Sequence, residues 1–200
     1  MVQEERVRYP DDEARYQWLS MLLDAYHLDD SAIGEGLERE RRKRTGTLAC
    51  TKGCSHCCLN PTVPVTEIEI YGLIWYCRRR LEGQTKDVVT DQLLNSHTMR
   101  QCPFLVDGLC AVYPLRPIAC RDFNVFGTQC EPYEDILSTR PDDIWSPGVD
   151  VARRVSMTLL PYYGITDDKR KRQAFETGFL GRMIVPLHTV NWRHLYAQVL

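Results

Sequence analysis

Hydrophobic residues recur at helical spacing over most of the chain outside its middle part. Near the N-terminus, the residues on one such face are Ala14, Trp18, Leu22 and Ala25. This spacing predicts a helix that opens at Pro10. A second helix, capped at Asp30 or Ser31, is predicted to continue through the charged run 38–44 and to stop at Gly46.

A further set of helical signals begins at Thr66. The sequence Thr66-Glu67-Ile68-Glu69 has the form of a capping box, which predicts a helix from there through Leu81. Gly83 is the expected stop. The further candidate helices are residues 86–99, 149–160, 166–184 and 187–199.

Residues 102–130 have a different pattern. Phe104 to Val106 and Leu109 to Tyr113 are short apolar runs separated by Asp107-Gly108. An Asp-Gly pair tolerates the positive φ angles of a tight turn, so this segment is predicted to form a β-hairpin near residues 104–112. The fold is therefore expected to be mainly α-helical, with one short hairpin in an irregular segment.

Composition and charge narrow the class of protein. Hydrophobic residues make up 44% of the chain, an ordinary share for a globular protein. The formal net charge is −2, with near-equal numbers of acids and bases, so no nucleic acid and no membrane is expected as a partner. The N-terminus is charged, and the longest apolar run, near Tyr71 to Cys77, is far shorter than the roughly 20 residues of a spanning helix. A cytoplasmic protein is expected.

The cysteines carry the strongest chemical signal, because eight of the nine fall in two blocks between positions 50 and 130. The first block has the spacing C-x3-C-x2-C-C and consists of Cys50, Cys54, Cys57 and Cys58. The second has the spacing C-x7-C-x9-C-x9-C and consists of Cys102, Cys110, Cys120 and Cys130. An odd count and a reducing cytoplasm disfavour disulfides. So many thiols around one CxxC pair indicate metal ligands, for zinc or for an iron–sulfur cluster.

Other interpretations of single residues in this region are less favoured. A thioredoxin-like dithiol of Cys54 and Cys57 would need a βαβ setting, which the pattern does not provide. Cys77 lies on an apolar helix face, and we expect it to be a small buried hydrophobe. His56 lies inside the first block, where a role beside the metal or facing solvent is favoured over ligation.

The adjacent pair Cys57-Cys58 adds a geometric constraint. In an extended backbone, neighbouring side chains point to opposite sides. The two thiolates would then serve different ions or different irons of one cluster, or one of them would be spare. Because a site made of thiolates keeps a net negative charge, cationic neighbours are expected, and the candidates are Lys52, Arg116 and Arg121.

The two blocks together resemble the CxxxCxxCC family of YkgJ-like proteins. The resemblance spans roughly residues 50–130 and includes Cys102-Pro103-Phe104-Leu105, Gly108-x-Cys110, Tyr113, Arg116-Pro117 and Cys120-Arg121. The family is described as zinc- or iron-chelating, or as containing iron and sulfur. It implies metal binding by Cys50, Cys54, Cys57, Cys58, Cys102, Cys110 and Cys120. Cys130 lies beyond the Cys-Arg pair, where the spacing varies among such proteins.

Two classes of function remain open. The first is an iron–sulfur protein in electron transfer, redox chemistry or protein modification. The second is a zinc module whose metal holds an irregular segment together for binding a protein partner, and metal storage or delivery is a third idea. A related cysteine region occurs in flagellin lysine methylases, but this chain is much shorter and has no recognisable motif for a methyl donor, so methylation is not expected.

The predicted organisation follows from these patterns. A helical extension over residues 1–48 precedes a cysteine-cluster metal-binding domain over residues 49–131, and a helical segment over residues 132–200 packs on it. The fold class is mainly α, with a metal-stapled irregular core and a short β-hairpin. The eight cysteines of the two blocks are the predicted ligands, of an iron–sulfur cluster or alternatively of zinc, and the two blocks are expected to converge in space.

Overall fold

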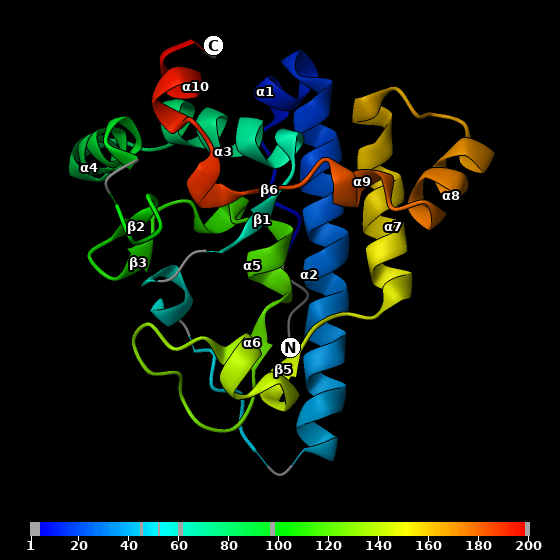
Figure 1. Ribbon diagram of the computed structural model, residues 1–200. Helices are drawn as coiled ribbons and strands as arrows, with labels where there is room; N and C mark the ends of the chain where they lie inside the picture. Colours follow the sequence, from blue (N-terminus) through cyan, green and yellow to red (C-terminus); the bar gives the residue numbers. More distant parts are fainter. Residues whose placement is uncertain (1–4, 45, 52, 60–61, 97–98, 199–200) are drawn as a thin grey trace.

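A computed structural model describes residues 5–44, 46–51, 53–59, 62–96 and 99–198. The fold is mainly α-helical, as predicted (Figure 1). The α-helices are α1 (Pro10–Arg15), α2 (Gln17–Lys43), α3 (Glu67–Arg79), α4 (Gly83–Leu94), α5 (Ile118–Asp122), α6 (Ile136–Thr139), α7 (Val149–Leu159), α8 (Asp168–Glu176), α9 (Phe179–Arg182) and α10 (Trp192–Gln198). Among the described residues, no helix is both long and apolar enough to cross a membrane.

Short 3-10 helices and two-residue strands connect these helices. The 3-10 helices are η1 (His56–Leu59), η3 (Tyr113–Leu115), η4 (Pro141–Asp143), η5 (Leu160–Tyr163) and η6 (Leu187–Thr189). The strands are β1 (Pro64–Val65), β2 (Leu105–Val106), β3 (Leu109–Cys110), β4 (Asn124–Val125), β5 (Ile144–Trp145) and β6 (Val185–Pro186). They pair antiparallel as β1 with β6, β2 with β3, and β4 with β5.

The N-terminal helices are divided at a different place from the predicted one. The break lies at Tyr16, and α2 continues without interruption past Asp30 and Ser31. The expected cap is absent there because the carboxylates have tertiary roles instead. Asp29 is buried, and Asp30 forms an ion pair with Arg121. Helix α2 is therefore one long support, along which α5 and α7 pack (Figure 1).

Two local predictions around α3 are confirmed. The capping box forms as predicted, with the Thr66 amide donating to Glu69 Oε2 at 2.8 Å, and the Thr66 hydroxyl also donates to this oxygen at 2.6 Å. The other oxygen of Glu69 accepts from the amide of Ile118 at 2.8 Å, so this buried carboxyl also joins α3 to α5. The hairpin forms as β2 and β3, and Asp107 and Gly108 have φ angles of 49° and 76°.

Three helix boundaries differ from the predictions. Gly83 has φ +55° and opens α4, which ends at Leu94 instead of extending over residues 86–99. Positions 97 and 98 lie outside the described residues. The predicted helix 166–184 is split into α8 and α9 by Gly178, whose φ of 66° is left-handed. The last helix begins at Trp192, because residues 187–189 form η6.

Helix α3 lies between two apolar cores. One face, including Ile68 and Trp75, packs with the α2 residues Leu19 and Leu22 and with α7. The opposite face packs with α4, the β2–β3 hairpin and Trp192. The second core includes Cys77, which is 1% exposed. The cysteine segments therefore lie beside a body that is already held by ordinary hydrophobic packing.

Candidate metal centre

The backbone of the first cysteine block is tightly turned. The amide of Cys54 donates to the Thr51 carbonyl, and that of Cys58 to the Ser55 carbonyl, both at 2.9 Å. Cys57 and Cys58 lie in η1 and not in an extended backbone. Successive side chains of a 3-10 helix are about 120° apart, so both thiols can reach one side. The premise of an extended backbone does not hold here, and the two thiols are electrostatic neighbours.

The second block meets the first at Cys58. The amide of Cys102 donates to the Cys58 carbonyl at 2.7 Å. Cys110 on β3 and Cys120 on α5 interact electrostatically with thiols of the first block. The backbones of the two blocks therefore meet, while a shared set of metal ligands stays a prediction. We call this set the inner thiols: Cys57, Cys58, Cys102, Cys110 and Cys120.

The remaining three thiols lie on the other side of the first block. Cys50 Sγ accepts a hydrogen bond from the Val125 amide at 3.3 Å. Its thiol is an electrostatic neighbour of Cys54 and Cys57. Cys130 is an electrostatic neighbour of Cys50 and Cys54. We call Cys50, Cys54 and Cys130 the outer thiols, and Cys50 is the member that connects them to the inner set.

All nine cysteines are free thiols, which agrees with the argument against disulfides. Interaction with the Cys102 thiol is the largest cause of the raised pKa of the Cys58 thiol, about 12, and burial adds to it. Burial is the main cause of the raised pKa values of Cys110 and Cys120. Neutral thiols are thus favoured in the metal-free chain, so metal binding here must displace protons.

Arg116 is the cation that faces the inner thiols. Its charge opposes the rise in the pKa values of Cys57, Cys110 and Cys120, and also of Cys50. The guanidinium carbon lies 4.5 Å from the centre of the Tyr113 ring, while the buried Nε has no hydrogen-bond partner. A buried donor without a partner, among thiols, suits a negatively charged centre.

Arg121 has a different environment from Arg116, although its charge also acts on Cys110. The buried Arg121 pairs with Asp30, donates to the carbonyls of Pro114 and Arg116 at 2.8 and 2.9 Å, and lies over the Tyr26 ring. It therefore fixes the backbone that carries Arg116 and Cys120. Lys52 lies outside the described residues.

The pairing of the Asp29 and Asp122 carboxyl groups beside Arg121 was not predicted. Asp29 on α2 is 1% exposed and interacts electrostatically with Asp122, which lies two residues after Cys120. Burial is the main cause of the raised pKa of both carboxyl groups. Sequence spacing gives no signal for this pair, because its members come from helices far apart in the chain.

The cysteines have the chemistry of thiolate ligands for a metal, although their sulfurs are not arranged around a common point. Among the described residues, no group of three or more Cys, His, Asp or Glu side chains is arranged to hold an ion. The donors are nevertheless free, neighbouring and soft, as zinc and iron–sulfur centres require. The buried Nδ1 of His56 also lacks a hydrogen-bond partner.

Eight free thiols from two chain segments, with the partly buried Arg116 near them, define a cysteine-rich metal-binding protein. Residues 49–141 match the family model CxxCxxCC, described as "Putative zinc- or iron-chelating domain". Over these residues the chain is similar to this family, and the resemblance seen in the cysteine spacing is confirmed. No curated protein and no solved structure matches the chain.

Proposed function

We propose that the inner thiols hold an iron–sulfur cluster and that the protein has a redox role. The observation that carries this proposal is the adjacent pair Cys57-Cys58 in η1, beside the second block. Zinc and iron–sulfur centres both take four cysteine ligands, so the number of thiols alone does not choose between them. Adjacent thiols that meet on one side suit a centre with more than one metal atom.

The surroundings of the inner thiols support a redox role more than a purely structural one. Cys57 is exposed while Cys102 is buried, so the set extends from the interior to the surface. When bound, an iron–sulfur cluster supplies one-electron chemistry. An exposed edge would let a partner protein exchange that electron, and protein modification that depends on such an electron is a second form of the same role.

The protein's own residues would set the properties of the centre. Arg116 would offset the negative charge of the thiolates, which stabilises the centre and favours its more reduced state. Arg121 would keep the Arg116 carbonyl and α5 in place through its backbone contacts. The pairing of Cys58 with Cys102 would hold the two blocks in register.

Anaerobic purification of the full chain tests the proposal. The expected result is a coloured protein that contains iron and acid-labile sulfide in comparable amounts, and whose visible absorption is bleached by dithionite. Colourless protein that contains zinc and no sulfide would contradict the iron–sulfur proposal and support the alternative, a zinc module that holds the segment together for binding a protein partner. Protein that takes up neither metal would refute both.

A further inference from the structure

Most of the strongly exposed large hydrophobic side chains lie in the cysteine region. Among the described residues, the five with the largest exposed fractions are Val149, Tyr133, Leu137, Leu109 and Tyr113. Four of these five lie between residues 102 and 143. Tyr133 and Leu137, which are 64% and 62% exposed, belong to one short loop between β4 and β5. Exposed apolar side chains that recur in one segment indicate a contact surface for another molecule.

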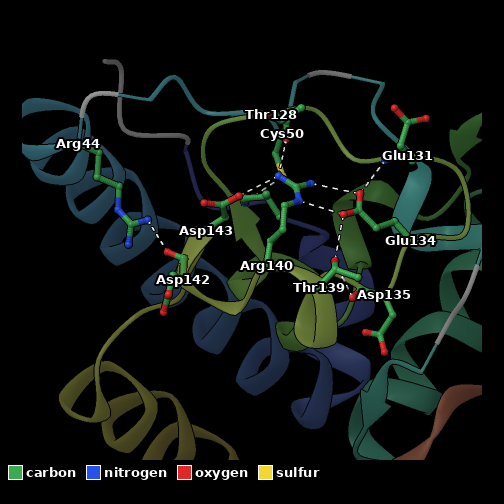
Figure 2. Close-up of polar contacts among 11 residues, drawn as sticks. Arg44, Cys50, Thr128, Glu131, Glu134, Asp135, Thr139, Arg140, Asp142 and Asp143 are labelled. Carbon is green, nitrogen blue, oxygen red and sulfur yellow. Dashed lines mark hydrogen bonds and ion pairs between the residues drawn. The ribbon is translucent and has the colours of Figure 1, made fainter.

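The loop with this apolar pair is closed at its base by one arginine. The guanidinium of Arg140 donates to both carboxylate oxygens of Glu134, at 2.9 and 3.2 Å. It also donates to Asp143 Oδ2 at 2.8 Å and to the Thr128 carbonyl at 3.0 Å, as Figure 2 shows. Thr128 follows β4 and Asp143 precedes β5, so these contacts, which we call the Arg140 clamp, close residues 127–143. A surface held in one shape loses little conformational freedom when a partner binds.

Inside the loop, α6 buries one apolar side chain and exposes the next. Ile136 is 4% exposed, whereas the neighbouring Leu137 lies largely in solvent. The Thr139 hydroxyl donates to Glu134 Oε1 at 3.0 Å, which joins the end of α6 to the Arg140 clamp. The exposure of Leu137 is therefore a property of an anchored turn.

Tyr133 is held in an unusual backbone conformation. Its φ of 66° lies in the left-handed region, which it shares with only one other described residue that is not glycine, Asp107 of the hairpin turn. A large side chain strains the backbone there, and such strain persists only where the surrounding structure enforces it. The next residue, Glu134, is fixed by Arg140. The clamp therefore maintains a conformation that presents an aromatic ring to solvent.

The charge around the apolar pair is negative. Residues 131–143 contain five acidic residues and one arginine, and that arginine is already paired within the clamp. Glu131 and Asp135 are exposed, and their carboxylates form no ion pair with the described residues. In Figure 2 both carboxylates point away from Arg140. A complementary partner would present positive charge around an apolar contact.

The same loop is attached to the first cysteine block. The Ala49 amide donates to the Val125 carbonyl, and the Gly127 amide to the Thr47 carbonyl, both at 2.8 Å. The Val125 amide also donates to Cys50 Sγ at 3.3 Å. A protein bound to the loop would therefore lie next to the segment that carries the first cysteines.

We propose that the exposed face of residues 131–139, centred on Tyr133 and Leu137, is the docking surface for a positively charged electron-transfer protein. The partner's redox role rests on the proposed function, whereas the surface is defined by exposed side chains, backbone geometry and charge. Tyr133 is the expected anchor, because aromatic side chains often dominate the binding energy of interfaces. Glu131 and Asp135 would increase the rate of encounter with a cationic protein.

A basic cytochrome c is a suitable probe, because it combines a cationic surface with a one-electron haem iron. Its binding to the full-length protein would be followed by surface plasmon resonance at low and at high ionic strength. The variants are Tyr133→Gly, Tyr133→Phe, Leu137→Ser, and the double variant Glu131→Gln with Asp135→Asn.

The controls change exposed residues outside the loop. Met183→Ser removes an apolar side chain that is 38% exposed. The double variant Asp150→Asn with Asp168→Asn removes the same number of negative charges from α7 and α8, which lie across α2 from α6 in Figure 1. An acidic ferredoxin serves as the control probe.

We expect Tyr133→Gly to weaken binding by about 5- to 30-fold, as the loss of an interface anchor does. Glycine accommodates the positive φ, so the thermal stability of this variant should be unchanged or higher. Tyr133→Phe should bind like wild type, and Leu137→Ser should lose about fivefold in affinity. The variant without the Glu131 and Asp135 charges should associate about tenfold more slowly at low ionic strength and depend less on salt. Both controls should behave like wild type.

Stopped-flow spectroscopy separates the docking surface from the redox role. One electron would leave the reduced centre, and the haem iron of the cytochrome would change from Fe(III) to Fe(II). The loop variants should slow this reduction in the same order as they weaken binding. Docking without electron transfer would support the surface and contradict the proposed redox function.

Three results would overturn the inference. Full affinity in both Tyr133→Gly and Leu137→Ser would exclude the loop as the docking surface. An equal loss in the Asp150 and Asp168 control would show that overall charge, and not this loop, attracts the cytochrome. Wild-type protein that does not bind the basic cytochrome at low ionic strength, or that prefers the acidic ferredoxin, would exclude a positively charged partner.

Discussion

Three arginines near the cysteines have different roles, which can be distinguished by their contacts. Arg121 is saturated by Asp30 and two carbonyls, and Arg140 by two carboxylates and one carbonyl. Arg116 keeps a buried Nε without a partner and acts electrostatically on thiols of both blocks. We therefore assign charge compensation to Arg116 and backbone support to the other two.

Replacing Arg116 by Gln should weaken zinc binding by the inner thiols by about 10- to 100-fold, because the thiolates lose their buried cation. Arg116→Lys should retain part of the affinity, since it restores the charge without the planar group over Tyr113. Arg79→Gln, on an exposed residue of α3, is the control. The measurement is competition with a chromophoric chelator, and equal affinity in Arg116→Gln and Arg79→Gln would contradict the assignment.

At this scale the sequence identified the thiols more reliably than their neighbours. Cys77 was separated correctly from the two blocks, because helical spacing placed it on an apolar face. Arg116 was named, but so was Lys52, which lies outside the described residues. Arg140 was missed, since its partners Thr128, Glu134 and Asp143 are defined by loop closure and not by any regular spacing.

Helix α2 supports the metal-binding region through its contact with β5. A methyl group on Gly36 would lie 2.2 Å from Cζ2 of Trp145, so only glycine lets the indole pack against the helix. Trp145 pairs with Asn124 of β4, the strand whose Val125 amide donates to Cys50. A change on the face of α2 would therefore be transmitted to the outer thiols.

Gly36→Ala should destabilise the protein by about 1–3 kcal/mol, because the rigid indole must move. Gly34→Ala is the matched control on the same helix. A methyl group there meets nothing within 4 Å, so this variant should be neutral or more stable by up to about 1 kcal/mol. Chemical unfolding followed by circular dichroism measures both changes. Equal stability of the two variants would show that Trp145 does not pack on α2 as described.

Elements with complete local signals could be predicted from the sequence. The capping box of α3 and the Asp107-Gly108 hairpin depend on residues a few positions apart, and both are confirmed. The division of the N-terminal helices was wrong because Asp30 and Ser31 have the composition of a cap. Their environment decides otherwise, since Asp30 pairs with Arg121, 91 residues away. Contacts between residues so far apart in the chain produce no periodic pattern in the sequence.

On the scale of the whole molecule, the fold combines a hydrophobic body with a cysteine region of little regular structure. The strands of that region are two residues long, and its 3-10 helices span three or four residues. Such segments bury little surface of their own, so metal binding should supply part of their folding free energy. The core that α3 shares with α2 and α7 contains no cysteine, whereas the other core includes Cys102 and the neighbouring Phe104 and Leu105.

Removal of the metal should therefore lower the local stability of some segments and leave that of others unchanged. In hydrogen exchange, chelator-treated protein should lose amide protection around η1, the β2–β3 hairpin and α5, while α2, α3 and α7 keep theirs. Readdition of metal should restore the protection. Uniform loss over the whole chain would show that the metal holds the complete fold, and no change at all would show that it holds none of it.

The convergence of the blocks was predictable because one metal centre needs ligands brought together, and neither block alone accounts for eight thiols. Their division into five inner and three outer thiols was not. That division depends on η1, which turns Cys57 and Cys58 towards Cys102, and on the closed loop that brings Cys130 towards Cys50. Neither feature is encoded in the cysteine spacing.

The central claim is that both blocks contribute to one metal centre, and metal content per protein tests it most directly. Elemental analysis would compare anaerobically purified wild type with Cys57→Ser, Cys102→Ser and Cys77→Ala. We expect both serine variants to lose most of the metal of the inner thiols, whereas Cys77→Ala keeps the wild-type content. Full metal content in Cys102→Ser, or loss in Cys77→Ala alone, would contradict a centre shared by the two blocks.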